Sequence, residues 1–252
     1  MGLGTATAER WVERWERQQQ RYAIDREERF TVVADVVEHV LAGRARPLVA
    51  DLGCGPGSLA ARLARRLPHA GIVAVDSDPL LLELGRTHHA DAARFVRAAI
   101  GEPGWTAALA LPGPLDAAVS TTALHCLPED ALRRTYEDLA ALLRPGGVLV
   151  NSDTVSADHG TTARIAQHVR RRRAERLGTP FHEDWESWWA AAARDPALTD
   201  LLAARRRQHH PPHSPHNGLT LARHLALLRT AGFRDADTVW QCSTDHVLVA
   251  VR

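Results

Sequence analysis

Lysine is absent from this sequence of 252 residues, and its 31 basic side chains are all arginine. They are balanced by 30 acidic residues, which leaves a formal net charge of +1. A chain so close to neutrality has no overall field that would draw it to nucleic acid or to a membrane surface. Neither kind of partner is therefore expected.

Cysteine is scarce, and long apolar runs are missing. The three cysteines, Cys54, Cys126 and Cys242, are far apart and odd in number, which argues against a disulfide framework. No run approaches the roughly 20 apolar residues needed to span a bilayer, and charges throughout the N-terminal segment leave no signal-peptide core. These absences predict a cytoplasmic protein.

The most informative segment that is present is a glycine-rich turn, Asp-Leu-Gly-Cys-Gly-Pro-Gly at residues 51–57. It follows a short β-prone run, Leu48 to Leu52, and precedes a helical pattern with leucine at every fourth position. This order predicts a strand, a tight turn and a helix, the opening of a βαβ unit. A second apolar run, 72–76, ends in Asp76, a carboxylate suited to a ribose diol.

The spacing of the glycines separates two kinds of ligand. A dinucleotide site has the pattern Gly-x-Gly-x-x-Gly, because pyrophosphate lies on the helix amides. Here the pattern is Asp-x-Gly-x-Gly-x-Gly, and the Asp51 carboxylate would disfavour pyrophosphate but attract an amino-bearing cation. The turn resembles the first motif of the class I S-adenosylmethionine-dependent methyltransferases, and Asp76 stands where that family keeps its ribose-binding acid. An accidental glycine-rich turn in another α/β domain is the alternative.

Strand and helix signals alternate from Leu48 to Asn151, and two further strands are expected over 238–242 and 246–251. The predicted fold class is α/β, a seven-stranded doubly wound sheet with helices on both faces. An N-terminal helical lid and a helical cap insertion after strand 5 complete the prediction. The resemblance implies three parts: a lid over 1–44, a Rossmann-like methyltransferase core over 45–152 and 218–252, and a substrate cap over 153–217.

The N-terminal residues 8–43 have the pattern of one or two amphipathic helices, in which Trp11 and Trp15 share a face. Packing against the sheet is one interpretation. The resemblance implies another, a lid over cofactor and substrate, which would bring Tyr22 near the site.

The resemblance also implies S-adenosylmethionine as cofactor and S-adenosylhomocysteine as product. The family usually has an acid after strand three, but residues 97–102 read Arg-Ala-Ala-Ile-Gly-Glu, so backbone groups are expected to recognise adenine instead. The residues expected to bind the cofactor are Asp51, Gly53, Cys54, Gly55, Asp76, Ser77, Ala99, Ile100, Thr121 and Tyr22.

Catalytic candidates follow strands four and five. The stretch Ala-Leu-His after strand four resembles the family and would place His125 near the sulfonium, although a structural histidine is the alternative. Asp153 would either orient a substrate amine or a base, or cap the following helix. The loop 209–216 is rich in proline and histidine, which favours a hinge or lid carrying a base over a metal site. The candidates are thus His125, Asp153, His213 and His216, with no metal expected.

The leading functional hypothesis is methyl transfer from S-adenosylmethionine to an oxygen or nitrogen nucleophile of a small molecule, such as a specialised metabolite, by in-line displacement. One alternative is a methyltransferase fold that binds the cofactor but catalyses a cyclisation or only senses it. A second is RNA or protein methylation, although the arginine runs 170–173 and 205–207 are interpreted as solvated helix faces. The tryptophan stripe at 185, 188 and 189 is interpreted as core, as a homodimer contact or as an aromatic wall for substrate.

Overall fold

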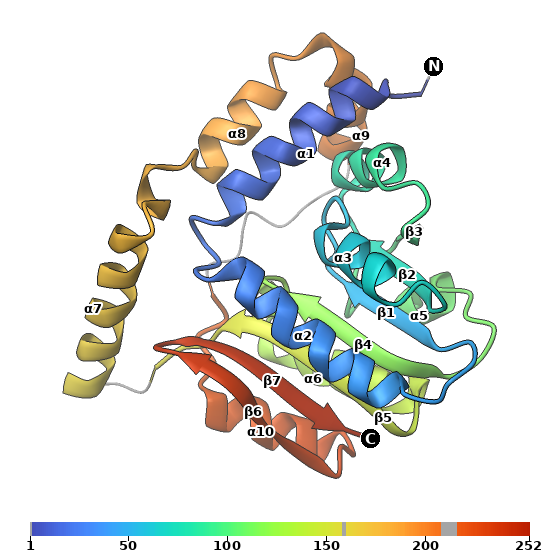
Figure 1. Ribbon diagram of the computed structural model, residues 1–252, viewed down its shortest axis with the longest axis vertical. Coiled ribbons are helices and arrows are strands. Elements are labelled where there is room, and N and C mark those ends of the chain that lie inside the picture. The colour runs from blue at the N-terminus through green and yellow to red at the C-terminus, as the bar shows by residue number, and fades with distance from the viewer. Residues whose placement is uncertain (1, 158–159, 208–215) are drawn as a thin grey trace.

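Short apolar segments rich in valine, alanine and leucine form the central strands, because strands covered on both faces need apolar side chains at nearly every position. The computed structural model describes residues 2–157, 160–207 and 216–252, and Figure 1 shows the sheet at its centre. The strand order is β3-β2-β1-β4-β5-β7-β6, with β1 to β5 parallel and β7 antiparallel to both of its neighbours. The strands are β1 (Leu48–Leu52), β2 (Gly71–Asp76), β3 (Arg94–Arg97), β4 (Leu115–Thr121), β5 (Leu143–Thr154), β6 (Asp235–Cys242) and β7 (Asp245–Val251).

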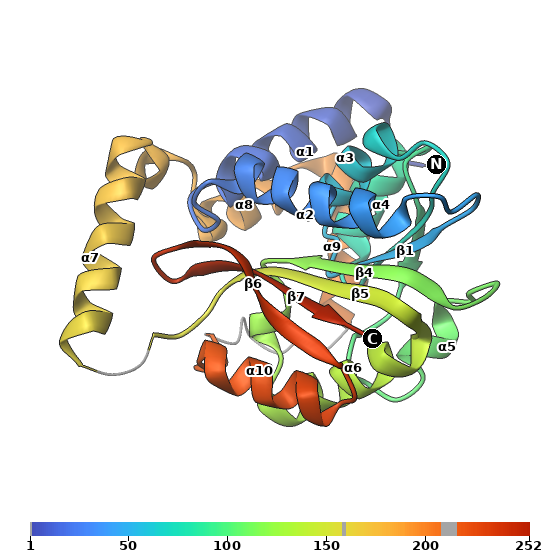
Figure 2. The same cartoon turned by 60° about the horizontal axis from the view of Figure 1, so that its bottom comes forward.

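Helices cover both faces of this sheet, which confirms the predicted doubly wound α/β fold (Figures 1 and 2). Helices α2 and α3 pack on the face that receives Val49, whereas α5, α6 and α10 pack on the face that receives Ala50. The helices are α1 (Thr5–Gln19), α2 (Arg26–Leu41), α3 (Ser58–Arg66), α4 (Pro79–His88), α5 (Trp105–Ala108), α6 (Glu129–Leu142), α7 (Thr161–Arg176), α8 (Trp185–Ala192), α9 (Thr199–Arg207) and α10 (Leu221–Thr230).

Capping residues set several helix limits. The Asp78 side chain accepts hydrogen bonds from the amides of Leu80 and Leu81, and Pro79 occupies the first turn of α4, where no amide hydrogen is needed. Thr220 likewise accepts from the Arg223 amide at the start of α10. Strand β5 extends over 12 residues, because its N-terminal end also pairs with β4 across an irregularity in the register.

The two N-terminal helices have different positions. Helix α2 packs on the sheet through Phe30, Val33 and Val37. Helix α1 instead packs on α4 and α8, and the Trp11 ring lies edge-on to that of Trp188 with centroids 5.2 Å apart. Packing on the sheet therefore describes α2 but not α1.

The segment between β5 and α10 is helical. Helix α7 stands away from the sheet in both views, whereas α8 and α9 join α1 and α4 (Figures 1 and 2). Trp188 is fully buried between Trp11 and Trp15, so the tryptophan stripe is first a core feature of this chain. Over the described ranges, no helix is long and apolar enough to cross a membrane.

The arginine runs are partly solvated, and some of their members pair with acids. Their members that form ion pairs with an aspartate are Arg170, Arg173 and Arg205, which contact Asp245, Asp25 and Asp78 respectively. In contrast, Arg171, Arg172, Arg206 and Arg207 are exposed. The paired arginines join the inserted segment to the rest of the chain.

Candidate active site

The glycine-rich turn lies at the carboxyl end of the sheet, between the turns that follow β2 and β4. Gly53 has φ of +67°, and a Cβ there would lie 2.3 Å from the Cβ of Ala123. Only glycine fits this close approach without movement of a neighbour. The amides of Gly53 and Cys54 donate to the carbonyl oxygen of Val75 at 2.8 and 3.0 Å, which holds the turn against β2.

Two carboxylates of adjacent strands lie beside this turn. Asp76 accepts from the Gly55 amide at 2.8 Å and from the Asp78 amide at 2.9 Å, so it joins the turns after β1 and β2. Asp51, almost completely buried, accepts from the Ala60 amide in the first turn of α3 at 3.1 Å. The predicted cofactor acids are thus brought together, with backbone amides positioning both.

Burial and nearby carboxylates make both acids receptive to a cation. Burial and, to a lesser degree, the neighbouring Asp76 raise the pKa of Asp51 to about 7 against the lowering effect of the Ala60 amide. Burial also raises the pKa of Asp76. A ligand with an ammonium group would relieve this repulsion. The donor set therefore fits the amino acid and ribose parts of S-adenosylmethionine.

The other predicted cofactor residues border the same edge. Thr121 is the last residue of β4 and is half-buried. Ser77, which follows Asp76, is also half-buried. The Cys54 thiol is buried, and burial raises its pKa well above the ordinary value, so it is a packing group and not a nucleophile. Trp15 of α1 covers the turn, since a Cβ on Gly55 would lie 3.5 Å from its ring.

The adenine end has no acid after β3, as the sequence indicates. Ala99 is exposed in the loop, while the half-buried Ile100 packs against the core under α5 and α6. Trp105 is buried, and its ring nitrogen donates to Asp138 at 2.6 Å. Adenine recognition through the backbone of residues 99 and 100 stays a prediction, as do all the cofactor assignments.

The catalytic candidates His125 and Asp153 form a pair. His125 lies in the short 3-10 turn Leu124–Cys126 after β4, and its Nδ1 is 2.6 Å from an Asp153 carboxylate oxygen. The His125 amide donates to the other oxygen at 3.1 Å. Asp153 belongs to β5 and is buried, so the expectation that it caps a following helix is wrong. It orients the histidine instead.

The pair is charged at neutral pH. Burial lowers the pKa of His125, but the Asp153 carboxylate outweighs this effect and raises that pKa to about 10. Burial raises the pKa of Asp153, but His125 and Arg29 lower it more, so the net change is downward. His125 is therefore an imidazolium that donates hydrogen bonds, and it has no vacant nitrogen to accept a proton at pH 7.

A second histidine stacks on this pair. The His216 ring lies 4.4 Å from that of His125, centroid to centroid, with 26° between the planes. Burial and the positive charge of His125 lower the pKa of His216, so it is neutral at pH 7. The amide of Asn217 donates to the His125 carbonyl oxygen at 2.8 Å, which anchors this end of the loop. His213, the fourth candidate, lies outside the described residues.

A cavity of about 410 Å³ opens beside the two histidines. Tyr22 lines it, so this predicted cofactor residue lies with the acceptor-side candidates; its hydroxyl also accepts from the Trp185 amide at 2.9 Å. Thr122 has φ of +54°, a rare conformation for a β-branched residue, at the mouth of β4. The lining residues are Arg21, Tyr22, Thr122, His125, Thr154, Val155, Ser156, Ala157, Gln167, Arg170, His216 and Thr244.

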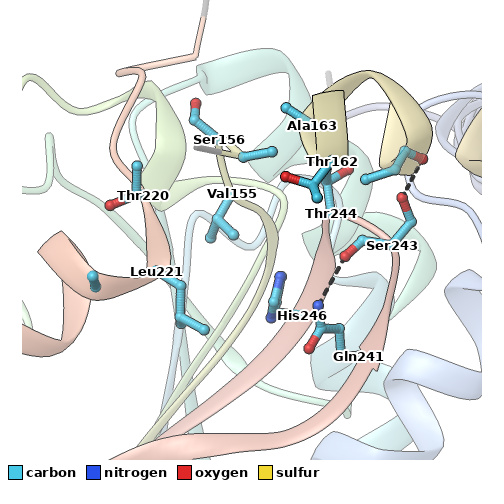
Figure 3. A pocket seen from close by; sticks show the side chains of 13 residues that line it. Val155, Ser156, Thr162, Ala163, Thr220, Leu221, Gln241, Ser243, Thr244 and His246 are labelled. Carbon is cyan, nitrogen blue, oxygen red and sulfur yellow. Dashed lines mark hydrogen bonds between the residues drawn. The ribbon is translucent and has the colours of Figure 1, made fainter. Parts of the chain in front are cut away.

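A smaller cavity of about 260 Å³ shares residues 155–157 and Thr244 with the larger one, and Figure 3 shows its lining. Its wall carries hydroxyl and amide groups together with His246, whose buried Nδ1 has no hydrogen-bond partner among the described residues. The Ser243 hydroxyl, labelled in Figure 3, donates to the carbonyl oxygen of Ala166 in α7 at 2.5 Å. This contact joins the β6–β7 turn to the base of α7.

Sequence reasoning missed a buried arginine behind the larger cavity. Arg29 of α2 is 2% exposed and donates to the Ser152 hydroxyl at 2.8 Å and to Asp245 at 3.4 Å. Asp245 in turn accepts from Arg170 of α7 at 3.0 Å and from the Thr154 hydroxyl. The available signal was the position of Arg29 one turn before Val33, on the apolar face of its helix.

No group of three or more histidine, cysteine or acidic side chains within the described ranges could hold a metal ion.

The region around the glycine turn and the central strands is similar to known proteins. Residues 49–147 match the family model described as a methyltransferase domain. An uncharacterised methyltransferase of Mycobacterium bovis is 45% identical over 102 residues, 40% of this chain and 47% of that protein. A trans-aconitate 2-methyltransferase of Deinococcus radiodurans is 35% identical over 115 residues, 45% of this chain and 40% of that protein. The chain thus spans less than half the length of these curated relatives.

Solved structures extend the likeness of fold to most of the chain. An O-methyltransferase family protein from Burkholderia thailandensis has a TM-score of 0.54 at 20% identity, over 93% of this chain and 62% of that one. Human N-acetylserotonin methyltransferase in complex with S-adenosylmethionine has a TM-score of 0.53 at 19% identity, over 95% and 56%. Residues 49–147 are therefore similar to methyltransferase domains, and the chain has the fold of solved S-adenosylmethionine-dependent methyltransferases.

Proposed function

We propose that this protein transfers a methyl group from S-adenosylmethionine to an oxygen or nitrogen nucleophile of a small molecule. The observation that carries the proposal is the position of two acids near strand ends, the buried Asp51 and the half-buried Asp76, at the same sheet edge as the pair of His125 and Asp153. In an open α/β sheet, ligands bind outside the carboxyl ends of the strands. The acids would hold the cofactor, and the cavity at His125 would hold the acceptor.

The chain's own residues contribute binding and alignment. Asp51 would attract the amino group of the cofactor, Asp76 would accept from its ribose hydroxyls, and Gly53 would let it approach the backbone. When bound, S-adenosylmethionine supplies an electrophilic methyl group on a sulfonium. Such a displacement depends mainly on proximity, in-line alignment and exclusion of water. The position of Trp15 of α1 over the glycine turn, with α8 and α9 packed beside α1 and α4, supports a lid that excludes water.

The acid–base groups depend on the acceptor. A hydroxyl or ammonium acceptor must lose a proton, and His216 is the neutral imidazole beside the cavity, whereas His125 is charged. The cavity volume of about 410 Å³ is typical of small-molecule sites, which favours a small acceptor over RNA or protein. The relatives named for trans-aconitate match less than half of this chain, so their acceptor is not carried over. A homodimer stays a prediction.

Replacing Asp76 by asparagine tests the cofactor site. Hydrogen bonds to a charged group contribute about 1.5–3 kcal/mol, so the variant should bind S-adenosylmethionine about 10- to 150-fold more weakly in a calorimetric titration. Asp91→Asn is the matched control, because Asp91 is exposed in the loop after α4. Equal affinity of the two variants would refute the ribose assignment.

Turnover is tested by incubating the protein with S-adenosylmethionine and a library of acids, alcohols, phenols and amines, with formation of S-adenosylhomocysteine as the readout. Methyl transfer to one class should exceed the rate without acceptor. Tight cofactor binding with no turnover on any class would instead favour a cyclase or a sensor.

A further inference from the structure

We propose that the acceptor is an organic acid, held in the larger cavity by Arg21, Arg170 and His125, and that one of its carboxylate oxygens receives the methyl group. This inference rests on the proposed function and names its acceptor class. Three observations support it: the sign of charge in the cavity, the fixed positions of the cations, and the state of the histidines.

The cavity wall carries positive charge. The charged side chains that line it are Arg21, Arg170 and His125, and no described acidic residue lines it. Behind the wall, Asp153 pairs with His125, and Arg170 shares Asp245 with Arg29. None of the described carboxylates lines the cavity itself, so a ligand there meets cations and neutral groups. An anionic ligand would therefore be favoured.

The cations are held in place by other contacts. Arg170 of α7 donates through Nε to Asp245 at 3.0 Å and through a terminal nitrogen to the Tyr22 carbonyl oxygen at 2.8 Å. Arg21 donates to the carbonyl oxygens of Pro180 and His182 at 3.0 and 2.9 Å. These bonds reduce the side-chain entropy lost when a ligand binds. Hydroxyl groups at Thr122 and Ser156 add neutral donors to the same wall.

The protonation of the site suits a nucleophile that carries no proton. The groups that raise the pKa of His125 are Asp153 of β5 and Cys126 of its own turn, and the neutral His216 ring stacks on it. Asp153 outweighs the effect of burial and keeps His125 cationic, as a donor to an oxyanion and not as a base. A carboxylate oxygen uses a lone pair to form the bond to the methyl carbon, the carbon–sulfur bond breaks with its electron pair going to sulfur, and no proton moves. The products are a methyl ester and a neutral thioether.

The binding test uses the full chain saturated with S-adenosylhomocysteine, which permits no turnover. A library of aliphatic and aromatic carboxylic acids is titrated against the primary amide of each acid, with ligand-observed NMR and calorimetry as readouts. We expect at least one acid to bind more than tenfold tighter than its amide. Arg170→Gln should reduce that acid's affinity about tenfold, since a charge-assisted bond is lost. Arg172→Gln, an exposed site on the same helix, should not. Amides binding as tightly as their acids throughout the library would overturn the proposal.

Because Arg170→Gln also breaks the contact with Asp245, Arg21→Gln is tested beside it, and both variants are checked by circular dichroism. A loss of acid affinity in Arg21→Gln supports the proposal even if Arg170→Gln misfolds; unchanged affinity in both folded variants overturns it.

The turnover test adds S-adenosylmethionine and identifies the product by mass spectrometry. With S-adenosylmethionine at saturation, we expect a methyl ester that releases methanol in mild base, formed at a rate nearly flat from pH 6 to pH 9. Methylation of alcohols, phenols or amines in preference to acids would overturn the carboxylate inference and leave the transferase intact. Acid binding without any S-adenosylhomocysteine formed would refute the transferase and leave the anion site.

Discussion

The charged pair of His125 and Asp153 makes a prediction that does not depend on any substrate. In Asp153→Asn the imidazole keeps its burial but loses its carboxylate, so its pKa should fall from about 10 to below its ordinary value. The asparagine side chain introduced by this substitution has nearly the same shape as the aspartate, and its oxygen can still accept from one amide. Most of the change should therefore be electrostatic.

The size and sign of the effect on stability follow from linkage. The pKa of His125 is raised above the unfolded value, so its contribution is complete below pH 6.5 and is lost as the pH rises through about 10. A rise from 6.5 to about 10 contributes about 4–5 kcal/mol to the free energy of unfolding at pH 6 but only about 1–2 kcal/mol at pH 9. Asp153, whose pKa is lowered, contributes equally at both pH values, because its stabilisation is lost only in acid.

The assay compares urea unfolding of the wild type and Asp153→Asn at pH 6 and pH 9. The difference in unfolding free energy between the two proteins should shrink by about 3 kcal/mol over this range. NMR titration of labelled histidine rings, with His125→Asn used to assign the signal, should give a pKa near 10 that collapses in the variant. A His125 that titrates near 6.5 in both proteins would refute the ion pair and, with it, the argument that no base is available at this position.

Two further predictions concern packing. Gly53→Ala should weaken S-adenosylmethionine binding and lower the unfolding free energy by about 1–3 kcal/mol, because the new Cβ combines a left-handed φ with a contact at 2.3 Å to Ala123. Calorimetry measures the binding and urea unfolding measures the stability. No change in either quantity would contradict the backbone geometry. Trp188→Ala should cost about 3–5 kcal/mol and loosen α1 and α8. Limited proteolysis should then cut the inserted segment faster than in Trp240→Ala, a half-buried control on β6, and equal rates would contradict the shared cluster.

Local features carried much of the prediction. The glycine turn, the strand-end acids and the caps of α4 and α10 depend on neighbours within a few residues, so they are visible in the sequence. The seven strands follow from apolar runs of the right length between turn residues. The position of the site also follows from the sequence, because successive parallel strands present their carboxyl ends at one edge.

The tertiary structure decided the contacts between residues that lie far apart in the chain. Asp153 accepts from His125 because β5 pairs with β4 in a register that sets Ser152 beside Thr121, which no local pattern specifies. The same long-range packing buries Arg29 and carries α1 away from the sheet to Trp188. By itself, the sequence therefore determined the fold class and where a cofactor would lie. Only the tertiary structure decided the charge state of His125 and the cationic character of the cavity, since both depend on strand order and on side chains that meet across elements. Electrostatic energies depend on distance and burial in space, not on separation along the chain.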